Sequence, residues 1–490
     1  MFEEKKPEWL ETAERLKPAL RFETVQPISG IPDHALMENE DVVLDFGNHF
    51  VGHLTLKVSS QGSHPDAPAW LSIKFCENAR ELDETLEGYN GWISKSWVQQ
   101  EQVHIDVLPA VIHFPRRYAF RFVKIKVLAL SSKYRLVIED AVAETTTSVD
   151  DNAVSPLIGD EADVVIDRVA LRTLRNCMQD FFEDGPKRDR RLWLGDLRLQ
   201  ALTNSVTYRN FDLVKRCLYL FAATSNEEGR IAACLFTEPI VEADDTFMFD
   251  YSLFFIPTLL QYVQATGDNV TKDDLLPLAW HQLKLADAQF DPDTNLIRDC
   301  DRLGWCFVDW ALKLNKQFCA QAIWIYCAEA ALQMNDDPAL EEKIAARKDA
   351  AKKHWYDEEL HLFVSDTEHQ ISWASQVWAV LAGILEGEEA AACLDAVASC
   401  PDAVQMVTPY MMHHYVEALC CVNRKAQARQ VIRDYWGAMV SNGADTFWEL
   451  FNPVDPYESP YGSHVVNSFC HAWSCTPAWF LRCGILEDRA

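Results

Sequence analysis

The sequence predicts a two-domain protein in which an antiparallel β-sandwich domain, residues 1–150, precedes a mainly α-helical domain, residues 151–490. Between about residues 20 and 145, apolar and polar residues alternate with the period of two that is typical of strands. After about residue 150, apolar residues recur every three or four positions, as they do on one face of a helix. No strand-like stretch separates these helices, so the pattern favours helices packed on helices over a parallel α/β barrel.

The expected strands lie within residues 41–60, 69–79, 102–114 and 118–130. These stretches are rich in β-branched and aromatic residues and are bounded by Gly, Pro, Asn and Ser. The tripeptide DFG at 45–47 also occurs in protein kinases, but neither a glycine-rich loop nor an HRD-type catalytic loop accompanies it. A strand end followed by a turn glycine accounts for it.

The helical region begins within residues 165–184, where Ile166, Val169, Leu174, Cys177 and Phe181 share one helix face. Further helices are expected at 251–268, 317–334, 372–385, 409–422 and 426–440. Six or more helix pairs with aromatic-rich connections would form a toroid of inner and outer helices. The 16 tryptophans would suit a carbohydrate-facing cavity, because sugar faces stack on indole rings. Aromatic residues at helical spacing are also common in cores, so composition leaves both interpretations open.

Composition excludes several classes of partner. Lys and Arg number 45 against 74 Asp and Glu, a net charge of −29 that would repel nucleic acid and anionic membranes. The N-terminal residues contain no apolar signal region, and no apolar run is long enough to span a membrane. We therefore expect a cytoplasmic protein with no nucleic-acid or membrane partner.

Fifteen cysteines are expected to be buried free thiols, because their number is odd and their spacing forms no ligand pair. His413 and His414 are adjacent and not one helical turn apart, and no HExxH motif is present. We expect neither a metal nor another cofactor.

Two segments carry a family resemblance. The stretch DGPKRDRRLWLGD (184–196) resembles the general-acid signature of glycoside hydrolase family 78, the inverting α-L-rhamnosidases, and GADTFWELFNP (443–453) is similar to the family segment that carries the general base. SFCHAW (468–473) resembles the stretch that follows that base, and weaker echoes occur at 249–257, 305–310 and 408–419. The segments LDFGNHFVGHLTLKV and RYAFRFVKI look like the family's accessory sandwich, which precedes an (α/α)6 barrel.

The resemblance implies that Asp189 is the general acid, counted seven positions back from Asp196, and that Glu449 is the general base. The family usually has Glu at the first position, so Asp189 is one methylene shorter and must lie closer to the glycosidic oxygen. Counting from the Gly-Pro end instead would place Arg190 there, which cannot donate a proton usefully and would predict an inactive hydrolase. Inverting hydrolysis needs two carboxyl groups on opposite sides of one sugar, and a closed barrel would bring these distant residues together.

The resemblance and the residue types together predict the remaining site. Guanidinium groups suit sugar hydroxyls and neighbouring carboxylates, whereas Lys187 and Arg190 are expected to be solvent-facing or paired with Glu183 and Asp184. For several of the residues predicted to bind substrate, helix capping, core packing or turn formation is an alternative role. The predicted substrate-binding residues are Asp184, Arg188, Arg191, Trp193, Asp196, Asp250, Trp305, Trp310, Trp448 and His471, and Trp473 is either wall or core.

These observations lead to one main hypothesis and two alternatives. The main hypothesis is a metal-independent, exo-acting α-L-rhamnosidase that releases terminal L-rhamnose from small, imported rhamnosides or oligosaccharides with inversion. A uronide-acting hydrolase or lyase on the same toroid would use the basic cluster to hold a uronate. A non-catalytic sugar-binding relative would bind rhamnose without turnover. The resemblance to short two-domain relatives also makes a homodimer plausible.

Overall fold

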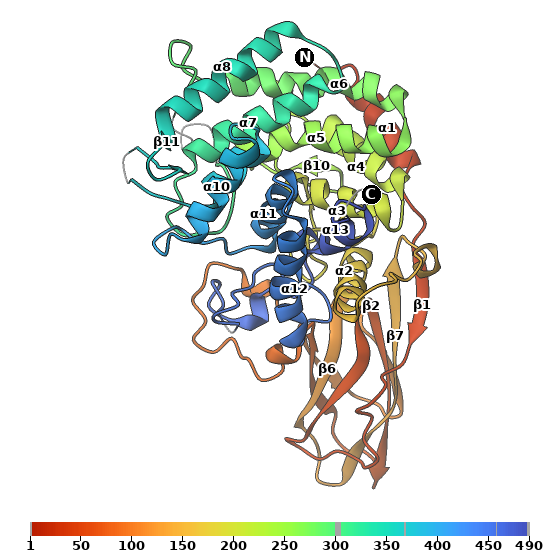
Figure 1. The fold of residues 1–490 in the computed structure, drawn as a ribbon. Coiled ribbons are helices and arrows are strands. Elements are labelled where there is room, and N and C mark those ends of the chain that lie inside the picture. The colour runs from red at the N-terminus through yellow and green to blue at the C-terminus, as the bar shows by residue number, and fades with distance from the viewer. Residues whose placement is uncertain (1, 299–304, 367–368, 457, 488–490) are drawn as a thin grey trace.

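The computed structural model describes residues 2–298, 305–366, 369–456 and 458–487. An antiparallel sheet region comes first in the chain, and a larger helical region follows it (Figure 1). The two regions lie against each other through the C-terminal end of α2, where Asn176 donates to His49 of β2 and the Arg175 carbonyl accepts from Thr147 of β7. Both helix and strand regions were expected from the sequence.

The sheet region is built from seven antiparallel strands in one hydrogen-bonded set, with the order β1-β7-β2-β6-β3-β4 and with β5 paired to β2. Strand β2 is the longest of them: its first part pairs with β6, and its second part pairs with β7 and β5. The strands are β1 (Arg21–Val25), β2 (Asp41–Gly62), β3 (Ala69–Cys76), β4 (Gln100–Ile105), β5 (Ala110–His113), β6 (Tyr118–Ala129) and β7 (Tyr134–Thr147).

Alternation along these strands turns apolar side chains inward to form one core. Phe46 meets Phe120 edge to face, and Phe75 stacks on Tyr118 with ring centroids 3.7 Å apart. These contacts join strands β2, β3 and β6, so the core explains why the period-two pattern identified the strands.

The helical region contains every helix that periodicity predicted and several that it did not. The expected helices are α2 (Glu161–Cys177), α5 (Phe249–Thr266), α7 (Gln317–Leu332), α9 (Trp373–Leu381), α11 (Pro409–Cys421) and α12 (Lys425–Ser441). The others are α1 (Lys6–Arg15), α3 (Leu194–Val206), α4 (Phe211–Ala223), α6 (Asn269–Asp287), α8 (Pro338–Trp355), α10 (Gly387–Ala398) and α13 (Pro477–Arg482). Short strand pairs also occur, β8 (Leu192–Trp193), β9 (Cys234–Phe236) and β10 (Glu242–Ala243) in one sheet and β11 (Tyr356–Asp357) with β12 (Leu362–Phe363) in another, which the sequence did not suggest.

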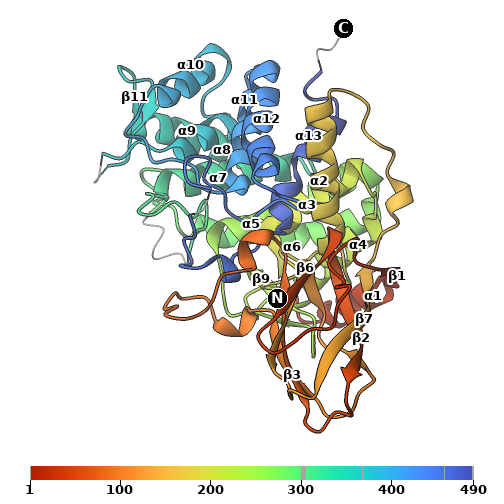
Figure 2. The same cartoon turned by 90° about the horizontal axis from the view of Figure 1, so that it is seen from below.

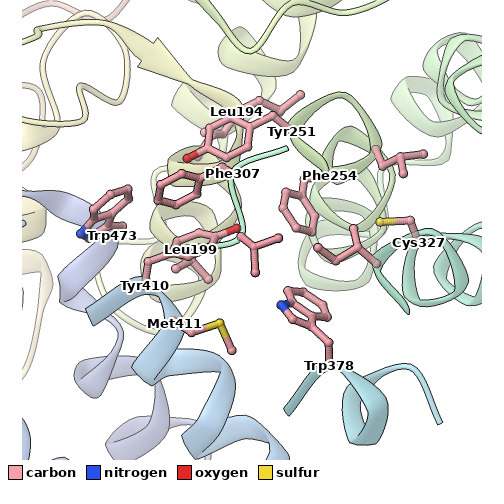
Figure 3. Packing of buried hydrophobic residues seen from close by; sticks show 14 of the residues in the cluster. Leu194, Leu199, Tyr251, Phe254, Phe307, Cys327, Trp378, Tyr410, Met411 and Trp473 are labelled. Carbon is pink, nitrogen blue, oxygen red and sulfur yellow. The ribbon is translucent and has the colours of Figure 1, made fainter. Parts of the chain in front are cut away.

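The helices pack in a closed circuit. Helices α3, α5, α7, α9 and α11 each contact the next, and a short 3-10 helix, Ala472–Cys475, contacts both α11 and α3. Around them, α4, α6, α8, α10 and α12 pack on this inner set. Figure 3 shows the interior between inner helices, where Tyr251, Phe307 and Trp473 lie near Tyr410 and Leu194.

The N-terminal helix α1 departs from the expected domain boundary. Although it precedes the strands in the chain, α1 packs on α4, and Trp9 is buried within the helical core. The Trp9 indole N–H donates to Asp274 of α6 at 2.9 Å. Residues 6–15 therefore pack with the helical region, whereas the expected division placed them in the sandwich.

Candidate active site

A cavity of about 310 Å³ lies where five chain segments meet. The segments are the loop between β3 and β4, the stretch 184–196 with the start of α3, the start of α5, the stretch 305–310, and the stretch 449–473. In both Figures 1 and 2 the orange β3–β4 loop lies beside the dark-blue chain near residue 460, so the sheet region helps to enclose the cavity. Its lining residues are Trp92, Ile93, Ser94, Trp97, Asp184, Arg188, Asp189, Arg191, Trp193, Asp196, Met248, Tyr251, Trp305, Phe307, Trp310, Glu449, Tyr461, His471 and Trp473.

The predicted general acid lies on a tightly fixed loop. The two carboxylate oxygens of Asp184 accept hydrogen bonds from the backbone N–H groups of Asp189, at 3.2 Å, and Arg191, at 3.0 Å. Gly185 allows the loop to approach the C-terminal segment, because a Cβ atom there would lie 2.7 Å from Ser468 Oγ. The loop thereby directs the Asp189 side chain into the cavity, while Arg190 lies outside it and donates to the carbonyl oxygens of Pro186 and Arg117.

Glu449 enters the same cavity from the C-terminal segment. Its backbone N–H donates to the Ser468 carbonyl at 3.1 Å, which pairs the two stretches that carry the second motif. One carboxylate oxygen accepts from the Tyr461 hydroxyl at 2.6 Å, and the other accepts from the Arg188 guanidinium at 2.5 Å. Arg188 also donates to the Val466 carbonyl and lies over the Tyr461 ring. Glu449 is therefore held from two sides.

A second acidic group lies at the start of α3. Asp196 accepts from His471 Nε2 at 3.1 Å and from the Tyr251 hydroxyl at 3.3 Å. Burial raises the pKa of Asp196. Burial alone would lower the pKa of His471, but its hydrogen bond to Asp196 and the charge of the nearby Glu449 outweigh burial and raise it. The His471 Nδ1 atom is buried and has no hydrogen-bond partner among the described residues. Gly195 is required here, because a Cβ would lie 2.5 Å from the Tyr251 ring.

Asp184 carries an unusual charge state for a carboxyl group. Burial, followed by the nearby charge of Asp189, raises the pKa of Asp184 to about 7. A buried carboxyl that is partly protonated near neutral pH can both donate to and accept from a hydroxyl group. Asp184 can therefore bind a hydroxyl group either as a donor or as an acceptor.

Aromatic side chains surround the cavity opening. Trp310 lies between Trp305 and Trp92, with ring centroids 5.7 Å and 6.2 Å away. Trp92 is 67% exposed and Trp305 is 45% exposed, whereas the carboxyl groups of the cavity are buried, apart from the partly exposed one of Asp189. We call Asp184, Arg188, Asp189, Asp196, Glu449 and His471 the charged end of the cavity, and Trp92, Ile93, Trp97, Trp305 and Trp310 its aromatic mouth.

Ten of the twelve predicted site residues line this cavity, and Asp250 and Trp448 do not. Asp250 is fully buried and accepts the backbone N–H groups of Phe307 and Val308, so it supports the wall from behind. Trp448 packs edge to face on Phe451 and Phe469, away from the cavity. Trp448 therefore belongs to the core of the helical region, although it is next to Glu449 in the chain.

The expected surface role of Lys187 is wrong. Its ammonium group is buried and pairs with Glu81 at 2.5 Å and with Glu77 at 3.6 Å, both of the sheet region. Glu183, its expected partner, instead accepts from Arg117 at 2.7 Å. Arg190 is mostly buried as well, with carbonyl partners and not the expected carboxylates. These partners are distant in sequence, so spacing could not reveal them.

Residues that sequence reasoning missed come mostly from the β3–β4 loop and from Tyr461. Trp92, Ile93 and Trp97 lie in an irregular loop of the sheet region, outside any recognised motif. Tyr461 contacts the predicted base but lies in a stretch that resembles no quoted motif. The sequence signal that could have indicated these residues was the pair Trp92 and Trp97 in the long connection between β3 and β4, since binding residues often lie on such loops.

Neither a metal site nor a membrane span is found in the described part of the chain. No group of three His, Cys, Asp or Glu side chains could hold a metal ion there. None of the helices there is long and apolar enough to cross a bilayer. The fourteen described cysteines are free, and most are buried.

Comparison with known proteins agrees with this geometry. Residues 10–145 match the glycosyl hydrolase family 78 alpha-rhamnosidase N-terminal domain, and residues 164–483 match the bacterial alpha-L-rhamnosidase 6 hairpin glycosidase domain. The chain belongs to the family 78 α-L-rhamnosidases. A rhamnosidase from Klebsiella oxytoca with rhamnose bound is 44% identical, covering 97% of this chain and 98% of that chain with a TM-score of 0.94.

More distant structures share the fold of this glycoside hydrolase. A family 78 rhamnosidase of Bacillus sp. GL1 is 22% identical over 92% of this chain and 47% of that chain, with a TM-score of 0.75. An α-L-rhamnosidase from Streptomyces avermitilis complexed with L-rhamnose is 15% identical over 95% of this chain and 44% of that chain, with a TM-score of 0.65. A comparison with curated proteins gives no match.

Proposed function

We propose that this rhamnosidase releases terminal L-rhamnose from small rhamnosides or oligosaccharides by exo-acting, inverting single displacement. The observation that carries the proposal is that Asp189 and Glu449, far apart in sequence, line one cavity together with family-motif residues. The rhamnose bound to the similar Klebsiella oxytoca rhamnosidase supports the choice of sugar.

The two carboxyl groups have complementary roles in this mechanism. Asp189 donates its proton to the glycosidic oxygen as the bond from the anomeric carbon to that oxygen breaks. Glu449 accepts a proton from a water molecule, whose oxygen forms the new bond to the anomeric carbon from the opposite face. The products are β-L-rhamnose and the protonated leaving group. Arg188 and Tyr461 fix the Glu449 carboxylate so that it faces the attacking water.

The other residues of the charged end bind the sugar hydroxyls. Asp184, Asp196 and Arg191 supply acceptors and donors, and His471 lies beside them in the cavity lining. Trp193, Trp305 and Trp310 form the apolar walls, and Trp473 forms part of the floor. The reaction in this proposal uses no metal or other cofactor.

The uronide alternative has less support. A uronate needs a cation that is free to bind its carboxylate. Arg188 faces Glu449, and Arg191 already pairs with Asp244 at 3.0 Å. The neutral rhamnose ring fits these paired guanidinium groups better.

The proposal extends to architecture, assembly and location. The closed circuit of inner helices with outer helices packed on it supports an (α/α)6 barrel for residues 151–490, with α1 added to it and the sandwich formed by the remainder of residues 1–150.

Exposed Phe22 lies on the edge strand β1, and Ile28, Ile31 and Met37 are exposed close after it, which supports a homodimer. Free thiols support a cytoplasmic location. Light scattering of the purified protein tests the dimer.

Glu449→Gln tests the mechanism directly. The amide cannot accept the water proton, so we expect kcat on an aryl α-L-rhamnoside to fall by at least about 1,000-fold. The melting temperature should also fall, because the buried Arg188 loses its charged partner, so kcat is measured at a temperature at which circular dichroism shows the variant to be folded. Proton NMR of the wild-type reaction should show β-L-rhamnose as the first product. Full activity of Glu449→Gln, or α-L-rhamnose appearing first, would contradict the proposal.

A further inference from the structure

Glu77 is a fully buried carboxylate at the boundary between the sheet region and the helical region. It follows the last residue of β3, and its exposed fraction is 2%. Its Oε2 atom accepts the backbone N–H of Phe469 at 2.8 Å and lies 3.6 Å from Lys187 Nζ. Its Oε1 atom lies 3.2 Å from His49 Nε2. One side chain of the sheet region thus contacts three other segments.

Two of these contacts lead directly to the two catalytic segments. Lys187 precedes Arg188 and Asp189 in the loop that carries the general acid. Phe469 follows Ser468, whose carbonyl accepts the backbone N–H of Glu449. A single oxygen atom of Glu77 therefore contacts the segment of the proton donor and the segment paired with the base.

The charge of Glu77 is maintained by its surroundings. Asn176 Nδ2 donates to His49 Nδ1 at 2.8 Å, so a neutral His49 carries its proton on Nε2 and donates it to Glu77. Burial opposes the charge, but Lys187 and His49 outweigh burial and hold the pKa of Glu77 below its ordinary value. The ionised Glu77 carboxylate binds Lys187 and the backbone N–H of Phe469 more strongly than a neutral side chain could.

Other residues of the sheet region also contact the catalytic segments. On the acid side, Arg117 pairs with Glu183. On the base side, the backbone N–H of His49 donates to Asp445, and the Asn78 amide donates to the Gly443 carbonyl at 3.1 Å. The sheet region therefore acts as a common frame for both segments, and the Glu77 carboxylate contacts both at once.

We infer that Glu77 is a positioning residue for catalysis: it sets the placement of the Asp189 loop relative to the Glu449 segment. This inference rests on the proposed function, which assigns the acid and base roles to those two residues. Inverting hydrolysis depends on the separation of the two carboxyl groups, since a water molecule must fit between the base and the sugar. A displacement of about 1 Å in such a site can reduce the rate about 100-fold.

The chain offers a matched control for this inference. Glu81 is equally buried and pairs with the same Lys187, but its other oxygen accepts only from Glu77 and Asn78 of its own loop in the contacts described. Glu77→Gln and Glu81→Gln both remove one buried negative charge beside Lys187. We expect kcat on aryl α-L-rhamnosides to fall about 10- to 100-fold in Glu77→Gln, with KM changed less than about threefold, and to fall much less in Glu81→Gln.

Two further measurements separate positioning from general destabilisation. Crystal structures of the two variants should show residues 187–189 displaced relative to 447–449 in Glu77→Gln and unchanged in Glu81→Gln. If Glu77→Gln does not fold, Glu77→Asp decides, because it keeps the charge but is too short to maintain both contacts. A decrease in its kcat at unchanged KM supports the inference, and wild-type kcat overturns it.

The outcomes distinguish this inference from the proposed function. If the wild type hydrolyses no aryl α-L-rhamnoside, the proposed function fails, and the structures alone then test whether Glu77 places the two segments. If the wild type is active and both Gln variants show equal kcat values and unshifted segments, the proposed function stands and the role of Glu77 is refuted.

Discussion

The charged end and the aromatic mouth of the cavity differ in how their side chains are held. At the charged end, Glu449 accepts two hydrogen bonds from protein donors and Asp184 accepts two backbone N–H groups. At the mouth, Trp92 has only ring contacts with Trp310 and Tyr461 among the interactions described, and much of its surface faces solvent. The polar groups of the charged end are therefore held in place before substrate binds, as catalysis requires. The aromatic mouth instead offers apolar side chains that can adjust to the substrate.

Replacing the proton donor should give the largest effect. In Asp189→Asn, general-acid assistance is lost, so we expect kcat to fall about 100- to 10,000-fold for rhamnosides with a poor leaving group. The loss should be much smaller for a 2,4-dinitrophenyl leaving group, which needs little protonation. Steady-state kinetics with both substrates checks this, and equal losses on the two would show that Asp189 does not act as the acid.

Asp250 lies behind the cavity wall and tests how far rigidity matters. Asp250→Asn replaces one acceptor oxygen with a donor, which then faces the N–H groups of Tyr251 and Phe307 in the place of Oδ1, or those of Phe307 and Val308 in the place of Oδ2. We expect the free energy of unfolding to fall by about 1–3 kcal/mol, since a buried N–H loses its partner. KM should rise more than kcat falls, because Phe307 lines the cavity. Thermal unfolding and kinetics measure both effects, and an unchanged melting temperature would refute the supporting role.

The raised pKa of Asp184 makes the free energy of unfolding of the protein depend on pH. Its pKa is about 7 in the folded protein and near 3.8 when unperturbed, so the folded state binds the proton more tightly. Proton binding by Asp184 therefore adds to the free energy of unfolding below about pH 4, and this added stability is lost as the pH rises to 7. Each unit of pKa shift corresponds to about 1.4 kcal/mol.

Asp184→Asn removes this contribution. Between pH 5 and pH 8, the melting temperature of the variant should therefore rise relative to that of the wild type. Scanning calorimetry at the two pH values measures the difference. A difference between variant and wild type that does not change with pH would contradict the assignment.

Trp92→Ala should give the smallest effect and the sharpest contrast between the two ends. Loss of one aromatic face costs about 0.5–1.5 kcal/mol, so KM should rise about 2- to 12-fold for a rhamnoside with a flat apolar leaving group. Methyl α-L-rhamnoside carries no apolar ring that could contact Trp92 and provides the control, with KM expected to be unchanged. Equal changes for both substrates would place Trp92 near the rhamnose ring instead.

The sequence predicted the charged end better than the mouth, and the reason is physical. Asp184, Asp189 and Asp196 lie in one compact motif whose spacing is fixed by a turn and the start of a helix. By contrast, Trp92 belongs to an irregular loop that has no periodicity. Its position depends on Tyr461 and Trp310, which are far away in sequence.

The fold shows the same limit. Amphipathic helices such as α2 and the strands β2 and β6 were predicted, because one face of each is apolar. Half of the residues in helix α8 are charged or His, and most of its apolar residues are alanines, so its sequence shows no strong apolar face. Pairing between regions, as in Lys187 with Glu81, depends on contacts that no local pattern encodes.

The buried ion pairs across the boundary restrict how this chain can be rearranged during evolution. A recombination event that exchanged the first 150 residues for those of a relative would leave Glu183 and Lys187 with mismatched partners, and unpaired buried charges cost several kcal/mol. The two regions are therefore expected to be inherited as a unit. By the same reasoning, the exposed end of the β3–β4 loop can diversify freely and adapt the enzyme to new leaving groups.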